Sequence, residues 1–149
     1  MIASNLQARR ATVDDLPTLR KLWQENGLAV AALEKQLTEF QIVETVEGKM
    51  LGAVALRIDG TQGQLHDEAF SRAEQADELR LLLWNRVRAI ARNHGLHRIW
   101  TNERAPFWSS SGFESPSADL LKMLPTALSD TGTTWLVLKL RDEIGRAHV

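Results

Sequence analysis

The interpretation of the fold depends most on one stretch of the sequence, Asn102-Glu103-Arg104-Ala105-Pro106-Phe107-Trp108-Ser109-Ser110-Ser111-Gly112-Phe113. Adjacent aromatic residues and a glycine are its most distinctive features. Taken alone, aromatic side chains such as Phe107 and Trp108 are typical of a hydrophobic core, and Gly112 is typical of the end of a helix. The stretch therefore predicts a small helix over residues 105–111.

A short strand and a long helix are predicted immediately before this stretch. Residues 97–101 form a short apolar run, which indicates a buried strand. Upstream, apolar residues recur at helical intervals between Leu79 and Ala91, with Asp77 as the expected N-cap and Gly95 as the expected C-terminal residue. The buried face of this helix is expected to include Leu82, Leu83, Val87 and Ile90.

Before the long helix, the hydrophobic pattern predicts two shorter helices and a three-stranded antiparallel meander. Thr12 and Asp15 have the spacing of a capping box, although Asp replaces the usual Glu or Gln, so a helix should begin there. Alternating apolar residues between glycine-containing turns indicate the strands. The expected helices cover residues 13–26 and 30–37, with Val13, Leu16, Leu19, Leu22 and Trp23 on one face of the first; the expected strands cover residues 6–11, 40–46, 50–58, 64–70 and 135–140.

Length and composition limit the classes of function. A chain of 149 residues is long enough for one domain with its own core, and the absence of cysteine excludes disulfides, thiolate metal sites and a cysteine nucleophile. The net charge is −1 with both signs mixed along the chain, so the basic surface needed to bind nucleic acid is missing. Apolar runs such as residues 81–84 are far too short to span a bilayer. We expect a single cytoplasmic domain that binds neither nucleic acid nor a membrane.

The last six residues, 144–149, have a separate interpretation. They can be encoded by ATC GGA AGA GCA CAC GTC, the start of a common sequencing-library adapter. An ordinary polar tail is the alternative, because codon degeneracy permits other gene sequences. We expect the native domain to cover residues 1–143 and residues 144–149 to be a non-native tail.

The predicted order of elements and the spacing within residues 102–113 resemble the GCN5-related N-acetyltransferases. The family carries Asn-x-x-Ala-x-x-Tyr-x-x-x-Gly-Phe, and Asn102, Ala105, Trp108 and the pair Gly112-Phe113 occupy these positions here. The resemblance covers residues 8–140 and implies an α/β fold with a mixed, mostly antiparallel sheet and helices on both faces. Residues 27–37, 40–47 and 124–125 look most like the amino-acid N-acetyltransferases of arsenic-resistance operons.

The resemblance implies transfer of acetyl from acetyl-CoA to the amine of a small molecule such as an amino acid. In the family, the pyrophosphate rests on backbone N–H groups at the start of the long helix, in a Gln/Arg-x-x-Gly-x-Gly turn. Counting back from Gly95 places residues 75–80 on that turn. The implied cofactor-binding residues are Phe70, Ser71, Arg72, Gln75, Ala76, Asp77, Glu78, Leu79, Arg80, Asn102, Ala105 and Trp108.

The turn departs from the family pattern in a way that changes its charge. Gln75 matches, but Glu78 and Arg80 stand where the family has glycine, and Asp77 is adjacent. These carboxylates would repel a pyrophosphate, and they also have a purely structural interpretation, since acidic residues stabilise the first turn of a helix. The departure favours a second hypothesis, in which a degenerate acetyltransferase fold acts as a binding or dimerisation module, for example as a homodimer.

Candidate catalytic residues lie on the third meander strand. His66 stands where the arsenic-type relatives carry an arginine that could hold a substrate carboxylate, and Glu68 follows two residues later. In a regular strand, Asp67 and Glu68 point to opposite faces, so at most one of them faces a site. Each of these residues can instead be an ordinary surface or hydrogen-bonded residue. His94 and His97 have no third ligand at suitable spacing, so no metal site is expected.

Proton donation to the leaving thiolate is a second point of departure. Trp108 occupies the position at which many relatives carry a tyrosine, and the chain contains no tyrosine. An indole cannot act as that acid, so another residue or water must supply the proton.

Overall fold

The structure is a computed structural model that describes residues 5–125 and 134–140. Residues 144–149, and with them the predicted boundary after residue 143, lie outside the described residues. The chain forms two compact units, Met1–Leu56 with Asp67–Arg88, and Arg57–His66 with Ala89–Val149. We call these the first and the second unit.

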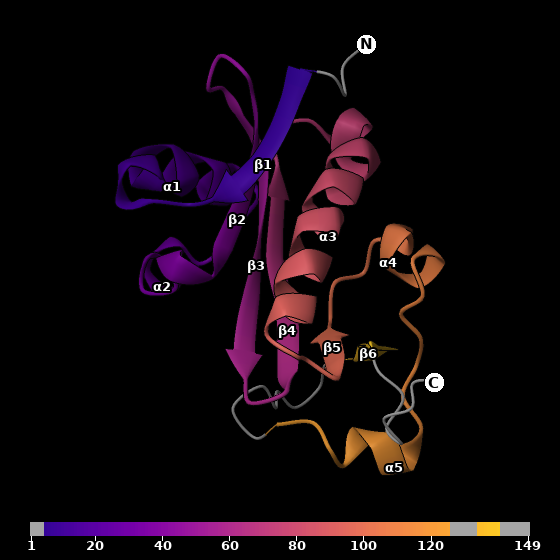
Figure 1. The fold of residues 1–149 in the computed structure, drawn as a ribbon. Helices are drawn as coiled ribbons and strands as arrows, with labels where there is room; N and C mark the ends of the chain where they lie inside the picture. Colours follow the sequence, from indigo (N-terminus) through magenta and orange to yellow (C-terminus); the bar gives the residue numbers. More distant parts are fainter. Residues whose placement is uncertain (1–4, 126–133, 141–149) are drawn as a thin grey trace. The chain divides into compact units, whose positions relative to one another are not determined.

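The strands form one sheet with the order β1-β2-β3-β4-β5-β6 (Figure 1). β1 pairs antiparallel with β2, β2 with β3, and β5 with β6, whereas β4 and β5 are parallel. The sheet is therefore mixed and mostly antiparallel, as expected. The strands are β1 (Leu6–Arg10), β2 (Phe40–Thr45), β3 (Met50–Asp59), β4 (Gln62–Phe70), β5 (Arg98–Thr101) and β6 (Leu136–Lys139).

The first helical segment begins as a 3-10 turn, Val13–Asp15, and continues as α1, Leu16–Glu25. The backbone N–H of Thr12 donates to the Asp15 carboxylate at 2.7 Å, as the capping spacing predicted. Val13 is 70% exposed, so its predicted place on the buried face was wrong. The reason is that a 3-10 turn has three residues per turn and places Val13 out of phase with the α-helix that follows.

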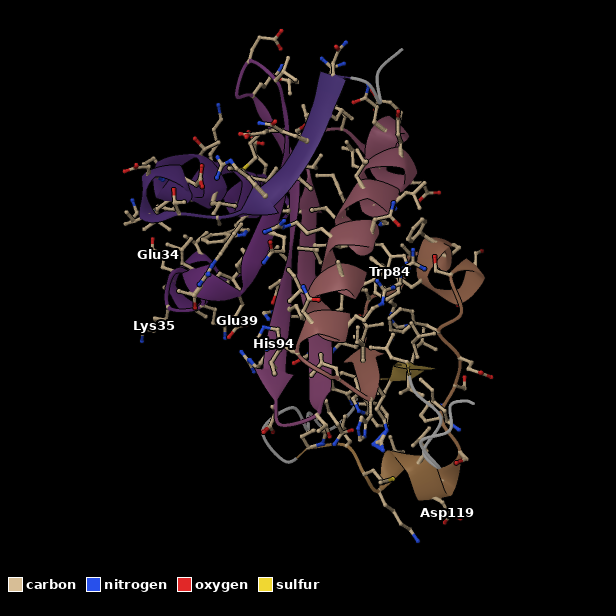
Figure 2. The ribbon with its side chains drawn as sticks, in the orientation of Figure 1. Glu34, Lys35, Glu39, Trp84, His94 and Asp119 are labelled. Atoms are coloured by element: carbon tan, nitrogen blue, oxygen red, sulfur yellow. The ribbon has the colours of Figure 1, made fainter. Side chains whose placement is uncertain are left out.

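The second helix is shorter than predicted. α2 covers Val30–Glu34, and the chain then makes a separate 3-10 turn at Leu37–Glu39 before β2. Gly27 follows α1 and has a φ of 72°, the left-handed conformation that is common just after the end of a helix. Arg20 of α1 forms an ion pair with Glu34 at the end of α2, and Figure 2 labels Glu34.

The helices α1 and α2 cover one face of the sheet in the first unit. The core there is centred on Trp23 and Phe40, whose ring centroids are 5.0 Å apart. Burial of such large side chains stabilises the fold by about 1.5–3 kcal/mol each. The buried members of this cluster are Ala11, Leu19, Leu22, Trp23, Leu33, Phe40, Ile42, Ala53, Ala55 and Ala69.

The long helix α3 contacts the opposite face of the first unit's sheet. Ile42 belongs to the core under α1, whereas its neighbour Gln41 accepts a hydrogen bond from Arg86 of α3 at 2.5 Å. Neighbouring side chains on a strand point to opposite faces, so helices cover both faces of this part of the sheet.

Helix α3 covers Ala76–Asn93 and begins earlier than predicted. Asp77 is therefore a first-turn residue, and its predicted N-cap role was wrong; a 3-10 turn, Ala73–Gln75, precedes the helix. Gly95 has the expected positive φ, 69°. Leu79, Leu83, Val87 and Ala91 form the fully buried row at intervals of four, whereas Leu82 and Ile90 are only half-buried.

In the second unit, β5 and β6 contribute to a small core that contains two tryptophans. Trp100 of β5 meets Trp135 edge to face, with centroids 6.5 Å apart, and Val137 of β6 completes the cluster. Helix α4 covers Pro106–Ser110, close to its predicted bounds, and α5, Ala118–Leu121, was not predicted. Within the part of the chain that the structure describes, no helix has the length and apolar character needed to cross a membrane.

Candidate functional site

The sequence placed the phosphate-binding turn at residues 75–80. In the structure the connection from β4 to α3 is residues 71–75, and residues 76–80 begin the helix. Arg72 is extended, with φ −139° and ψ 122°, and the following residues form the 3-10 turn. The N–H of Gln75 donates to the carbonyl of Arg72 at 3.3 Å, and the N–H of Ala76 donates to the carbonyl of Ala73. The N–H groups of Gln75 and Ala76 thus donate to carbonyls of the turn. At the start of a helix such N–H groups are otherwise available to bind an anion.

The end of β4 is held by two neighbouring segments of the first unit. Ser71 donates from its N–H and its hydroxyl to the carbonyl of Leu51 on β3, at 2.9 and 3.2 Å. The side-chain amide of Asn26, just after α1, pairs with the backbone of Phe70, donating to its carbonyl at 3.2 Å and accepting from its N–H at 3.3 Å. Asn26 was expected only as a helix end; an amide placed before Gly27 is the one signal that could have suggested this role.

The Phe70 ring has a fixed place against β3. A Cβ added at Gly52 would lie 2.5 Å from the ring, so only glycine leaves the room that the ring occupies. Gly52 stands at an irregularity of the β2–β3 pairing, where Val43 faces Gly52 and Glu44 faces Met50. The guanidinium of Arg80 lies 4.9 Å above the ring centroid, a cation–π contact.

Arg80 links the first turn of α3 to β4. Its Nη2 lies 2.5 Å and its Nε 3.0 Å from the Glu68 carboxylate, and its Nη1 lies 2.7 Å from the Asp77 carboxylate. The Arg80 and Glu68 side chains are only 14% and 11% exposed, whereas Asp77 is 76% exposed. Burial lowers the pKa of the guanidinium, but the hydrogen bonds and charges of Glu68 and Asp77 outweigh it and raise the pKa above its ordinary value. Arg80 is therefore engaged by two carboxylates.

The start of α3 carries exposed acidic groups. Asp77 and Glu78 both lie in its first turn and are exposed. Acidic residues stabilise this end of a helix by about 0.3–1 kcal/mol, but they also repel an anionic ligand. A like-charge pair at 4 Å costs about 1 kcal/mol in water and about 4 kcal/mol near a protein surface. Arg80 offsets the charge of Asp77, and Glu78 forms no ion pair or side-chain hydrogen bond with another described residue.

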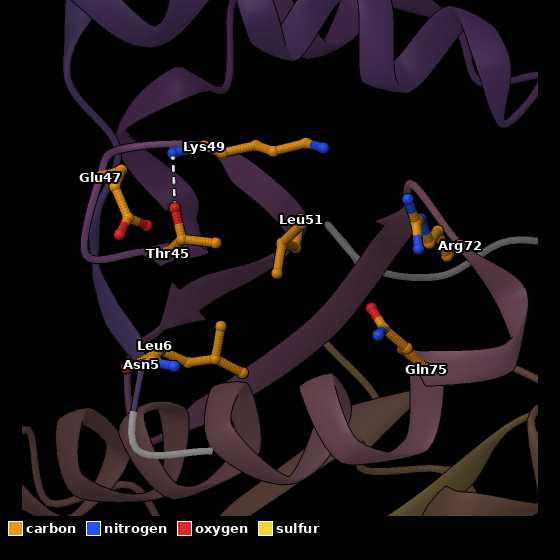
Figure 3. Close-up of a pocket in the computed structure, with 8 residues that line it drawn as sticks. All are labelled: Asn5, Leu6, Thr45, Glu47, Lys49, Leu51, Arg72 and Gln75. Carbon is orange, nitrogen blue, oxygen red and sulfur yellow. Dashed lines mark hydrogen bonds between the residues drawn. The ribbon is translucent and has the colours of Figure 1, made fainter. Parts of the chain in front are cut away.

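A cavity of about 340 Å³ opens beside the 71–75 connection (Figure 3). Arg72 and Gln75 line it together with Lys49 from the β2–β3 turn, and Figure 3 shows the Lys49 side chain extending toward Arg72. The remaining lining residues are Asn5, Leu6, Thr45, Glu47 and Leu51. A second cavity of about 360 Å³ shares Lys49 and is also lined by Lys21 and Ser71.

The candidate catalytic residues lie on β4 around a backbone irregularity. His66 is buried, with 5% exposure. Asp67 has a φ of 53°, in the left-handed region that few residues other than glycine adopt, although Asp tolerates it better than most. Side chains of a regular strand alternate between the two faces of the sheet, but this alternation is interrupted at a residue with positive φ. The expectation that Asp67 and Glu68 point to opposite faces therefore does not hold here. Glu68 itself is held by Arg80.

The remaining predicted residues lie in the second unit. Asn102 is half-buried in the loop after β5, and Ala105 is the extended residue that precedes α4. Trp108 is 1% exposed and packs edge to face against Phe107 and Phe113, with centroids 5.0 and 5.8 Å away. Gly112 has a φ of 112°, which explains the need for glycine after α4. The structure thus gives Trp108 a core position.

Most of the predicted residues gather in one place within each unit, whereas His66, which belongs to the second unit, lies on β4. The first unit gathers Glu68, Phe70, Ser71, Arg72, Gln75, Asp77 and Arg80 around the start of α3, and the second gathers Asn102, Ala105 and Trp108 around α4. Among residues 5–125 and 134–140, no group of three or more His, Asp or Glu side chains is arranged to hold a metal ion.

No family model matches the sequence, and no curated protein matches it. Solved structures do match it. N-acetylglutamate synthase from Neisseria gonorrhoeae, complexed with coenzyme A and L-arginine, has a TM-score of 0.75 at 23% identity over 93% of this chain. The match covers 34% of the synthase chain, so this chain spans about a third of that protein's length.

Two matches extend over nearly whole chains. Rv2747 from Mycobacterium tuberculosis, in complex with CoA and NLQ, has a TM-score of 0.70 at 20% identity and covers 89% of this chain and 98% of its own. Tetrahymena GCN5 has a TM-score of 0.73 at 11% identity and covers 95% and 99%. The fold of this chain is therefore the fold of the GCN5-related N-acetyltransferases, as the sequence predicted.

Proposed function

We propose that this chain transfers the acetyl group of acetyl-CoA to the amine of a small molecule, and that an amino acid is the substrate class. The main support for the proposal is the similarity of fold, over 93% of the chain, to a synthase whose structure was solved in complex with coenzyme A. The same type of synthase was also solved with coenzyme A and N-acetyl-glutamate. The sequence resemblance to the arsenic-resistance amino-acid acetyltransferases supports the same substrate class.

The residues at the 71–75 connection fit the phosphates of a coenzyme A donor through side chains. Arg72 and Gln75 line the cavity beside the connection, and Ser71 fixes their backbone to β3. Glu78 and Arg80 stand at the positions of the two glycines in the family's turn. Side-chain cations can bind the phosphates instead, since Arg and Lys both bind phosphate groups.

Acetyl transfer forms a C–N bond and breaks a C–S bond, so a proton must leave the amine and another must reach the thiolate. His66 is the proposed base or substrate contact, because it is a buried imidazole beside the left-handed Asp67 on β4. We assign Glu68 a positioning role, since its carboxylate is bound to Arg80. Without tyrosine in the chain, the thiolate takes its proton from another residue or from water.

Two measurements test the proposal on the purified chain. Calorimetry with acetyl-CoA is expected to give a dissociation constant of about 100 µM or tighter, and incubation with single amino acids is expected to release free coenzyme A thiol. The His66→Ala variant should bind acetyl-CoA like the wild type and lose turnover. Thiol release that is equal with and without an amino acid would contradict the proposal.

The degenerate hypothesis stays the second candidate, because a specific observation favours it. Glu78 is exposed and without an ion pair at the helix start among the described residues, and the 3-10 turn uses N–H groups of the connection. This hypothesis expects a dissociation constant for acetyl-CoA of about 1 mM or weaker and no thiol release with any amine. A chain with those properties is a binding or dimerisation module, which sedimentation as a homodimer would support.

A further inference from the structure

We propose that two copies of this chain pair through the outer side of strand β1, with the two β1 strands antiparallel. β1 is the first strand in the order of the sheet, and among the described strands it pairs only with β2 (Figure 1). The side of β1 that faces away from β2 is therefore a sheet edge. An edge with free backbone N–H and C=O groups is a template on which another strand can pair.

The hydrogen bonds between β1 and β2 show which backbone groups point outward. The N–H of Ala11 donates to the carbonyl of Phe40 at 3.0 Å, so these two residues form a hydrogen-bonded pair. In antiparallel strands such pairs alternate with pairs whose backbone groups point away from each other. Counted back from Ala11 along the register, every second residue of β1 therefore points its N–H and C=O outward. These residues, which we call the β1 edge, are Leu6, Ala8 and Arg10.

The backbone groups of the β1 edge are available for a second strand. Of the hydrogen bonds between described residues, one reaches these outward groups, from Nη1 of Arg9 to the Arg10 carbonyl at 3.0 Å. A carbonyl oxygen has two lone pairs, so the Arg10 carbonyl can accept a further hydrogen bond. The edge thus offers three N–H groups and three carbonyls.

An antiparallel pairing centred on Ala8 matches the β1 edges of two copies. The two Ala8 residues exchange two hydrogen bonds, and Leu6 of each copy exchanges two with Arg10 of the other. A two-fold axis permits this arrangement, because both copies use the same surface. The register satisfies all the outward backbone groups of both strands.

The two arginines of β1 do not prevent this pairing. Arg9 is neutralised within its own chain, by ion pairs with Asp15 and Glu44 at 2.8 Å each. Arg10 of the second copy lies opposite Leu6, four residues from Arg10 of the first copy. The backbones that carry the two Arg10 side chains are therefore about 13 Å apart, and repulsion between exposed charges at that distance is largely screened.

The same register brings opposite charges together at each end of the paired strands. Arg10 of the second copy lies beside Leu6, and Leu6 pairs with Thr45, two residues before Glu47. Figure 3 shows Glu47 on the same side of the picture as Thr45 and Leu6. Arg10 and Glu47 are both exposed, and neither forms an ion pair with another residue that the structure describes. Exposed pairs add little affinity, but they favour one register over others.

Exposed apolar side chains at the two ends of β1 support the same partner. Val13 and Val46 are 70% and 58% exposed, more than any other large apolar side chain of the described residues. Val13 follows the end of β1 by three residues, and the N–H of Val46 donates to the carbonyl of Asn5, just before β1, at 3.0 Å. Antiparallel pairing places the Val13 end of one copy beside the Val46 end of the other, twice in the dimer. A second copy thus covers apolar surface that the single chain leaves in water.

The first test measures association of the full chain without acetyl-CoA or amine, so its outcome does not depend on the proposed function. Sedimentation should show a dimer with a dissociation constant of about 100 µM or tighter. In ¹⁵N-labelled protein, the amides of Leu6, Ala8 and Arg10 should exchange with solvent more slowly as the protein concentration rises. A chain that stays monomeric would assign the edge to a strand of another protein and overturn the proposal. A dimer that leaves these three amides unprotected would overturn it as well.

Removal of one outward N–H tests the edge directly. Ala8→Pro should raise the dissociation constant of the dimer at least about tenfold, because each copy loses a donor at the centre of the pairing. The β1–β2 pairing should persist, since proline is tolerated where the N–H of an edge strand faces solvent. Gln7→Pro is the matched control: the N–H of Gln7 faces β2, so its loss should destabilise the monomer in chemical denaturation. An unchanged dissociation constant for Ala8→Pro would contradict the proposal.

Charge reversal is a second test that leaves the backbone unchanged. Arg10→Glu should raise the dissociation constant at least about fivefold, because carboxylates then meet at both ends of the pairing. Arg10→Glu combined with Glu47→Arg should return it to within about twofold of the wild type, a recovery that a folding defect cannot mimic. Lys35→Glu, at an exposed cation that Figure 2 shows on the outside of the α2 region, should change it less than about twofold. A double variant as weak as Arg10→Glu alone would place the association elsewhere and overturn the proposal.

Discussion

The segment 102–113 follows the family spacing and the turn after the 71–75 connection departs from it, and different forces hold the two regions. The segment follows the family spacing and is fixed by packing, with Trp108 buried between Phe107 and Phe113. The connection and the helix start after it are fixed by backbone hydrogen bonds and by the carboxylates bound to Arg80. The spacing of residues matches the family where the hydrophobic core depends on it. The charge of the residues at a surface turn can differ from the family without loss of the fold.

The largest expected effect concerns the packed segment. Trp108→Ala should lower the free energy of unfolding by about 3–5 kcal/mol, because a large side chain with 1% exposure leaves a cavity. Chemical denaturation measures the loss, and Ser109→Ala, at an exposed neighbour, should change stability by about 0.5 kcal/mol or less. A small loss for Trp108→Ala would place the side chain in a ligand site instead of a core.

The long helix α3 offers the next test. Leu83→Ala should cost about 2–5 kcal/mol, since Leu83 is fully buried, whereas Leu81→Ala should cost little because Leu81 is 51% exposed. The pair is matched in chemistry and differs only in the face of α3. Similar losses for the two variants in denaturation would show that the buried face is assigned incorrectly.

The charged network at the connection should contribute less than the core does. Arg80→Ala leaves the Glu68 carboxylate, 11% exposed, without its counter-charge, so we expect a loss of about 1–3 kcal/mol. Glu68→Gln in the same background should recover part of that loss. A double-mutant cycle with purely additive losses would show that the 2.5 Å contact is not a stabilising interaction.

The smallest expected effect is on ligand binding at the acidic helix start. Glu78→Gly should tighten acetyl-CoA binding about tenfold at low salt, about 1.4 kcal/mol, because it removes an exposed negative charge and restores a family glycine. Glu78→Gln separates the charge from backbone freedom. The gain should shrink at physiological salt, where exposed charges are screened over about 8 Å. A gain in calorimetry that is independent of salt would attribute the effect to glycine alone.

Periodicity and glycine positions predicted most of the fold. The intervals of apolar residues located every strand and the helices α1, α2, α3 and α4, and Gly27, Gly95 and Gly112 all have positive φ where a helix was expected to end. The parallel pairing of β4 with β5 followed from the strand, helix, strand order. These features are local, or follow from the order of elements, which is why the sequence alone contains them.

The predicted site residues were located less completely than the fold. The sequence identified the segment from Phe70 to Arg80 because its spacing to Gly95 is fixed by the length of the helix. It did not identify Lys49 or Asn26, which lie 23 and 44 positions away from Arg72 and Phe70 in the chain. Residues that meet only through folding leave no regular spacing in a single sequence.

The sequence by itself therefore determined the order of the described strands and of α1 to α4, the family resemblance and the acidic character of the α3 start. Only the tertiary structure decided that Arg80 binds Glu68, that Asp67 is left-handed and that Lys49 shares a cavity with Arg72. Periodicity records which face of an element is buried, because burial acts on each element separately. Hydrogen bonds, ion pairs and cavities depend on the distance between side chains from different elements, and that distance exists only once the chain has folded.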